Sequence, residues 1–133
     1  MVKQGDNKVW LQEMRKGFLS MAILRVISSG PHHGYGIIKG IYEMTGFQWN
    51  PSPGSVYPAL SGLEKLGYIT PVSTSGEGDK RRKVYAITAK GEEALKQARL
   101  ELDMLRREFN SIFDYNLLDN TQGMNKGMNK KTG

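Results

Sequence analysis

The chain has 133 residues, contains no cysteine and carries a net charge of +6 at pH 7. This length accommodates one domain with its own core and is too short for two. The absence of cysteine excludes a disulfide framework and thiolate chemistry, and it agrees with the cytoplasmic location that we expect.

The positive charge is concentrated in the first two thirds of the chain. Residues 1–91 hold 12 Lys and Arg against 6 Asp and Glu, whereas residues 92–133 hold 7 of each. This segregation favours a polyanion such as nucleic acid as the partner. A charged surface that serves only solubility is the alternative.

The first predicted helix carries its apolar residues on one stripe and ends at the segment SSGP, residues 28–31. Arg25 interrupts its apolar run, which is also too short to span a bilayer, so we expect a core helix and no membrane association. The stripe consists of Leu11, Met14, Phe18, Ala22, Ile23, Val26 and Ile27.

A second, shorter helix is predicted from about Gly34 through Glu43, closed by Thr45 and Gly46. The following segment FQWNP, residues 47–51, is expected to be extended, because a residue before proline is disfavoured in the helical region. Trp49 in this segment is expected to anchor the core, and its neighbour Asn50 is a candidate DNA contact.

The third predicted helix lies in the segment SPGSVYPALSGLEKLGYI, residues 52–69. A start between Pro53 and Ser55 places Pro58 in or near the first turn, where little hydrogen bonding is lost, and Gly67 provides the stop. Val56, Ala59, Leu60, Leu63 and Leu66 lie on one face, and its stripe Val56, Leu60 and Leu63 is expected to be buried. The outward face is expected to hold Ser55, Tyr57, Ser61 and Lys65.

Two short strands, residues 69–73 and 83–88, are predicted around a glycine-rich turn, and Pro71 marks the first as an edge strand. Three helices followed by such a hairpin predict an α+β, mostly α fold: a winged helix-turn-helix. The third helix would then enter the DNA major groove, while the hairpin cations neutralise phosphates. These cations are Lys80, Arg81, Arg82 and Lys83.

The last predicted helix carries a heptad seam, with apolar residues spaced alternately three and four apart. The seam has two explanations, packing against the first helix of the same chain and homodimerisation; we expect both, with homodimerisation as the main role. It consists of Leu95, Ala98, Leu102, Leu105, Phe109 and Ile112.

Three segments of the chain resemble the PadR-family transcriptional regulators over roughly residues 15–95. They are HGYGIIKGI (residues 33–41), the third-helix segment SPGSVYPALSGLEKLGYI, and KRRKVYAITAKGEEAL (residues 80–95). The resemblance implies a dimeric winged-helix repressor with a C-terminal dimerisation helix and a double-stranded DNA operator of two related half-sites. The DNA-binding residues it indicates, together with our own candidates, are Tyr35, Lys39, Asn50, Ser55, Tyr57, Ser61, Lys65 and the cations Lys80, Arg81, Arg82 and Lys83.

The chain departs from some drug-sensing relatives, which carry a tryptophan on the C-terminal helix. Its two tryptophans, Trp10 and Trp49, lie elsewhere. An effector, where one exists, is expected to be small and aromatic or hydrophobic, and to bind between the winged domains and the dimer helices. The expected pocket residues are Leu11, Met14, Phe18, Leu102, Leu105 and Phe109.

These inferences divide the chain into four parts. We expect a disordered arm at residues 1–8, the winged domain at 9–91, the dimerisation helix at 92–118, and a disordered basic tail with a repeated GMNK at 119–133. No constellation of catalytic or metal-ligating residues is apparent, so no enzyme activity, cofactor or metal is expected; the pair His32 and His33 is interpreted as an ordinary loop pair. An architectural or adaptor protein, which uses the winged helix for non-specific DNA or protein contacts, is the alternative to the repressor.

Overall fold

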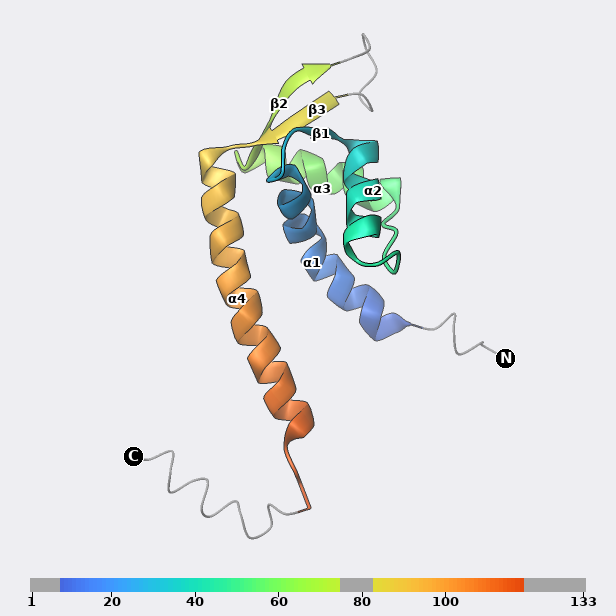
Figure 1. Cartoon of the computed structure of the whole chain (residues 1–133), viewed down its shortest axis with the longest axis vertical. Coiled ribbons are helices and arrows are strands. Elements are labelled where there is room, and N and C mark those ends of the chain that lie inside the picture. Colours follow the sequence, from blue (N-terminus) through green and yellow to red (C-terminus); the bar gives the residue numbers. More distant parts are fainter. Residues whose placement is uncertain (1–7, 75–82, 119–133) are drawn as a thin grey trace, which may run out of the picture. The chain divides into compact units, whose positions relative to one another are not determined.

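The computed structural model describes residues 8–74 and 83–118. The chain divides into two compact units, Met1–Ala98 and Arg99–Gly133. Its elements follow the expected order, with one additional short strand (Figure 1). They are α1 (Val9–Ile27), β1 (His32–His33), α2 (Gly34–Met44), α3 (Pro53–Lys65), β2 (Ile69–Thr74), β3 (Lys83–Ile87) and α4 (Ala89–Asp114). The fold is mostly helical with a small antiparallel sheet and a long last helix, as expected.

The core of the first unit lies among α1, α2 and α3, which all contact one another. Ile23, Ile37 and Val56, one from each helix, are completely buried. Trp49 is buried as expected: its ring stacks on Phe18 at 5.8 Å between centroids. On α1 the predicted stripe is buried at Ile23, Val26 and Ile27, but Met14 of that stripe is 56% exposed, and the spacing missed Leu19 and Leu24, which are buried.

The connection after α2 is not extended throughout. Gly46 and Phe47 both adopt positive φ angles, 64° and 63°, and the Phe47 N–H donates to the Tyr42 carbonyl at 2.8 Å. The expectation of an extended segment from Phe47 was wrong at this residue, because a left-handed pair closes the C-terminal turn of α2. Beyond it, residues 48–50 have no regular structure.

Helix α3 begins at Pro53, behind a cap in which Ser52 Oγ accepts the Ser55 N–H at 3.2 Å. Pro58 therefore lies in the second turn of the helix and removes the bond that its N–H would have donated to the Gly54 carbonyl. Gly67, with φ of 81°, ends the helix: its N–H donates to the Glu64 carbonyl and the N–H of Tyr68 to the Leu63 carbonyl. This pair of bonds is a Schellman motif, and it places the expected stop at Gly67.

The sheet has the strand order β1-β3-β2, and its pairs are antiparallel. Strand β2 lies at an edge, as Pro71 predicted, and its register with β3 is irregular between Pro71 and Ser73. The outer ends of β2 and β3 project beyond the helices (Figure 1). Strand β1 was not predicted: His32 pairs with Tyr85, and the His33 side chain caps α2 by accepting the Gly36 N–H at 3.1 Å.

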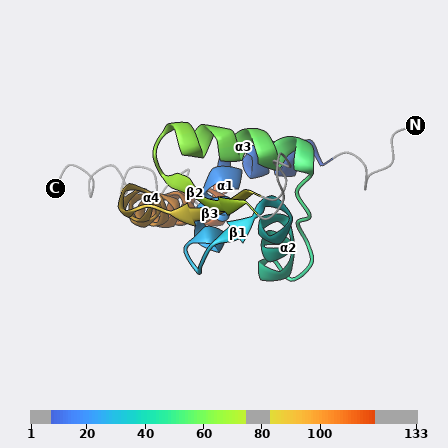
Figure 2. The same ribbon diagram turned by 90° about the horizontal axis from the view of Figure 1, so that it is seen from above.

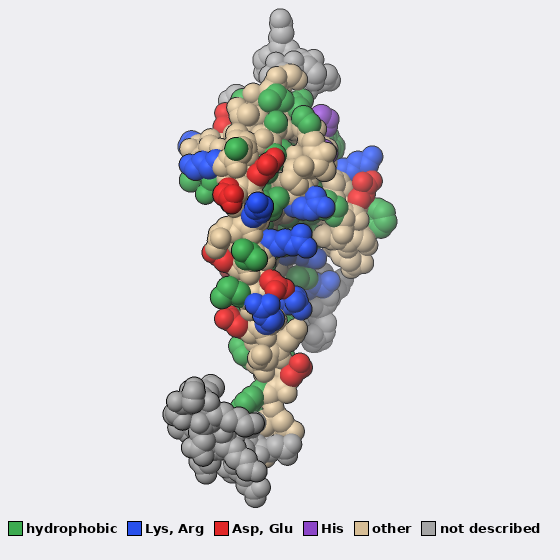
Figure 3. All heavy atoms as spheres, turned by 60° about the vertical axis from the view of Figure 1, so that its left-hand side comes forward, with side chains coloured by type: hydrophobic (Ala, Val, Ile, Leu, Met, Phe, Trp, Pro, Cys, Tyr) green, Lys and Arg blue, Asp and Glu red, His purple; other side chains and the backbone are tan. Residues whose placement is uncertain are grey.

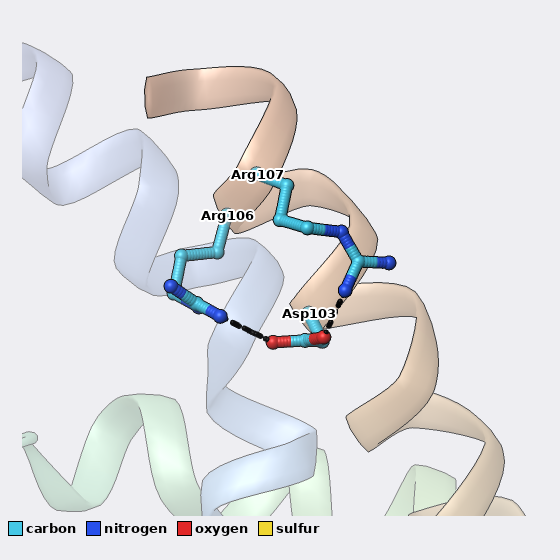
Figure 4. Close-up of polar contacts among 3 residues, drawn as sticks. All are labelled: Asp103, Arg106 and Arg107. Atoms are coloured by element: carbon cyan, nitrogen blue, oxygen red, sulfur yellow. Dashed lines mark hydrogen bonds and ion pairs between the residues drawn. The ribbon is translucent and has the colours of Figure 1, made fainter. Parts of the chain in front are cut away.

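Helix α4 starts three residues before the expected boundary at 92 and ends four residues before 118. In the second unit, Asp103 accepts hydrogen bonds from Arg106 Nη2 at 2.7 Å and from Arg107 Nη1 at 2.6 Å (Figure 4). The hydrogen bond from Arg106 is the main reason that the pKa of Asp103 lies below its ordinary value. Such pairs, three and four residues apart, stabilise a surface helix.

Among the described residues, no helix is long and apolar enough to cross a membrane.

Candidate nucleic-acid interface

The beginnings of α2 and α3 lie at the same end of the first unit, as the view from above shows (Figure 2). On α2, Tyr35 is 75% exposed and Lys39 is also exposed. On and before α3, the side chains of Asn50, Ser55, Ser61 and Lys65 are exposed. Six of the candidate DNA-binding residues thus present hydroxyl, amide or ammonium groups to solvent, which are groups that bind phosphate oxygens.

Tyr57 does not face outward as expected. Its side chain is half-buried and packs against the core, and a Cβ added at Gly34 would lie 2.6 Å from its ring and hydroxyl. The helical spacing placed Tyr57 on the outer face because it does not take account of α2, whose first residue lies against the ring. Gly34 allows this close approach, which brings the starts of α2 and α3 together.

Lys83, the one hairpin cation among the described residues, has partners within the chain. Its Nζ lies 3.6 Å from the Glu64 carboxylate of α3 and 5.6 Å from the ring centre of Tyr85. Its side chain is 31% exposed, so it is less available to a phosphate than Lys65. Lys80, Arg81 and Arg82 lie outside the described residues.

Tyr85 lies beneath this ion pair and is 7% exposed. Burial raises the pKa of its hydroxyl; Lys83 opposes the shift and Glu64 adds to it. The hydroxyl therefore stays neutral at pH 7. Tyr85, Lys83 and Glu64 together connect strand β3 to α3.

The predicted seam on α4 divides between the two units. Leu95 and Ala98 are half-buried in the first unit, where Leu95 packs against the core, and in the second unit Leu102 is also half-buried. Leu105, Phe109 and Ile112 are 59%, 49% and 70% exposed. The heptad pattern missed further exposed apolar residues, because it followed a single line along the helix; these are Leu100, Met104 and Phe113. Figure 3 shows hydrophobic side chains among charged ones on the surface of α4.

The expected pocket residues of α1 are not equally free. Phe18 stacks on Trp49, whereas Met14 is 56% exposed and Leu11 is half-buried. Trp10, which the sequence placed in no site, is 83% exposed on the same helix. A shallow hollow on α4 is lined by Met104, Arg107, Glu108, Ser111 and Ile112, none of which was an expected pocket residue.

Comparison with known proteins gives these features a context. Residues 23–97 match the family described as "Transcriptional regulator PadR-like family". The chain is 35% identical over 89 residues to the transcriptional regulator YqjI of Escherichia coli K12. That match includes 67% of this chain and 41% of the relative, so the chain spans less than half the length of this curated relative.

Two solved structures share the fold over most of their length. A transcriptional regulator from Clostridium thermocellum has a TM-score of 0.67 at 31% identity, covering 74% of this chain and 96% of its own. A PadR-like transcriptional regulator from Bacillus cereus ATCC 14579 has a TM-score of 0.65 at 30% identity, covering 78% and 99%. The family match, residues 23–97, includes α2, α3 and the strands β2 and β3.

Proposed function

The chain belongs to the PadR-like family of transcriptional regulators, and we propose that it is a dimeric repressor that binds an operator of two related half-sites and leaves it on a small-molecule or other signal. The observation that carries this proposal is the exposed polar surface along α2 and α3, which runs from Tyr35 and Ser55 near their starts to Lys65 in the last turn of α3. There Tyr35, Lys39, Ser55, Ser61 and Lys65 stand on two packed helices of a winged helix-turn-helix.

In this proposal α3 enters the major groove. Its exposed hydroxyl and ammonium groups suit phosphates better than base edges, since Arg, Asn and Gln are the residues that make most bidentate base contacts. Much of the sequence preference then comes from DNA shape and from the hairpin cations. Ser61→Ala and Lys65→Ala should each weaken binding without relaxing the preference at one base pair.

The exposed apolar residues of α4 support a homodimer. Leu105, Phe109 and Ile112 follow the heptad seam, and a helix exposing such a stripe gains stability when a second chain covers it. Two copies would place two α3 helices on half-sites about one helical turn apart. The effector would bind near Leu11, Met14, Phe18, Leu102, Leu105 and Phe109, and would change that separation.

Selection of bound sequences from a random DNA pool tests the proposal, followed by titration of the selected site at several salt concentrations. Recovery of an inverted repeat is the expected result, with affinity reduced when Arg81 and Arg82 become alanine. Changing Lys96 and Arg99 to alanine removes the same charge from α4 and is the control. Enrichment of no sequence, with weak binding that only falls with salt, would support the architectural or adaptor alternative instead.

A further inference from the structure

The end of α3 and the beginning of α4 are bound to each other, although more than twenty residues separate them along the chain. The contacts join Leu66, Gly67 and Tyr68, which follow α3, to Thr88, Lys90 and Gly91, where α4 starts. We call these six residues the α3–α4 joint. All of them lie in the first unit and in the described part of the chain.

Thr88 makes contacts in both directions. Its hydroxyl donates to the Gly67 carbonyl at 2.6 Å and accepts the Gly91 N–H at 3.0 Å. Its backbone N–H donates to the Tyr68 carbonyl at 3.0 Å, and its carbonyl accepts the Glu92 N–H at 2.9 Å. The residue that caps α4 is therefore also the residue that holds the turn ending α3.

Lys90 adds a second connection. Its Nζ donates to the Leu66 carbonyl at 2.8 Å and lies 5.5 Å from the centre of the Tyr68 ring. The ammonium group thus binds one of the carbonyls left unpaired at the C-terminal end of α3, where positive charge is favourable.

Gly91 determines how closely the two elements approach. It is buried, and a Cβ at this position would overlap the carbonyl oxygen of Tyr68 and lie 2.8 Å from Ile87 Cγ1. Because the atom in the way belongs to the backbone, a side chain here would force α4 away from the turn after α3.

We propose that the α3–α4 joint makes α3 and the first turns of α4 a single rigid body. Thr88, Lys90 and Gly91 thereby set the spacing between half-sites that the dimer accepts. The inference rests on the proposed function, because it concerns two copies bound to two half-sites. The three residues act as positioning residues: they need touch neither DNA nor effector. A rigid joint transmits a change in the pairing of two α4 helices to α3, whereas a flexible one absorbs it.

A distance measurement within one chain tests the rigidity without DNA. The chain has no cysteine, so cysteines introduced at Ser61 on α3 and Glu93 on α4 carry the only spin labels. Labelled protein diluted with unlabelled protein should give a narrow distance distribution. Thr88→Val and Lys90→Met should each broaden the distance distribution, whereas Thr88→Ser, which keeps the hydroxyl, should leave it narrow. Lys96→Met removes the same charge from an exposed position of α4 and should leave the distribution unchanged. Equal widths for folded Thr88→Val and the parent protein would overturn the proposal.

Half-site spacing tests the consequence for DNA binding. Insertion of one to three base pairs between the half-sites should reduce the affinity of the parent protein steeply, and that of Thr88→Val and Lys90→Met several-fold less. A structural role alone would weaken binding equally at every spacing, and that outcome would refute the positioning role. If the parent protein selects no repeated site, the proposed function fails, while the label distances still decide whether the joint is rigid.

Discussion

At Gly34 the packing of α2 against α3 leaves no room for a side chain. Gly34→Ala should destabilise the fold by about 1–3 kcal/mol, the usual cost of overpacking, because the new methyl group meets the Tyr57 ring at 2.6 Å. Gly17 in the middle of α1 has nothing within 4 Å of its Cβ position, so Gly17→Ala should stabilise by up to about 1 kcal/mol. Urea unfolding of both variants checks the pair. Equal effects would show that the Tyr57 ring moves aside freely.

Tyr85 should make stability depend on alkaline pH. Burial raises the pKa of its hydroxyl in the folded state, so its stabilising contribution is complete below the unfolded value of about 10 and is lost as the pH rises through the folded pKa. The free energy of unfolding should therefore fall more steeply above about pH 10 in the parent protein than in Tyr85→Phe. Denaturant unfolding at several alkaline pH values measures this free energy. If it falls equally steeply with pH in both proteins, the expectation is contradicted.

At the scale of elements, the ion pair between Lys83 of β3 and Glu64 of α3 should make Lys83 a weak phosphate contact. Lys65→Met should reduce the salt slope of DNA binding by about one, the value for one lost phosphate contact, and Lys83→Met by clearly less. Glu64→Gln frees Lys83 and should steepen the slope. DNA titrations at four or more salt concentrations compare the three variants with the parent protein. Equal slopes for the two methionine variants would place Lys83 on the DNA.

The elements were predictable where burial imposes a periodicity. The buried residues Val56, Leu60 and Leu63 of α3 were found from their apolar spacing, and the ends of α3 from Pro53 and Gly67, because these two residues act through local backbone chemistry. The spacing on α1 was only partly correct, since it missed the buried Leu19 and Leu24. Strand β1 was missed, since two residues carry no period and its pairing with β3 is non-local.

The candidate site was predictable to a smaller extent, for a related reason. Helical spacing gives the direction of a side chain relative to its own helix, as it did for Ser61 and Lys65. It gives no information about what another element places there, such as Gly34 under Tyr57 or Glu64 beside Lys83. Phe47 was misjudged because a left-handed aromatic residue has no local sequence signal.

For the whole molecule, we propose a division of function in which the first unit binds DNA and α4 joins two copies of the chain. The charge distribution agrees with this division, since the excess of Lys and Arg lies entirely in residues 1–91. A single winged domain gains little specificity from phosphate contacts, so two half-sites read by linked copies would supply it.

Dimerisation through α4 should make thermal stability depend on protein concentration. If folding is linked to association, the parent protein's Tm should rise with concentration, because mass action favours the associated folded state. The double change Leu105→Glu and Phe109→Glu places two charges on the exposed seam and should abolish that dependence, giving a monomer by analytical ultracentrifugation. Asn110→Glu and Ser111→Glu, on exposed polar residues of the same helix, are the matched control.

The variant with Leu105→Glu and Phe109→Glu also separates the effect of dimerisation on DNA affinity from that of direct DNA contacts. On a duplex with two half-sites it should lose affinity by ten-fold or more, about 1.4 kcal/mol, because the second half-site is no longer bound within one complex. On a duplex with one half-site it should bind as the parent protein does at equal protomer concentration. A parent protein that sediments as a monomer would refute dimerisation itself. A seam variant that still dimerises would refute the role of Leu105 and Phe109 and transfer it to other exposed apolar residues such as Trp10 and Met14 on α1.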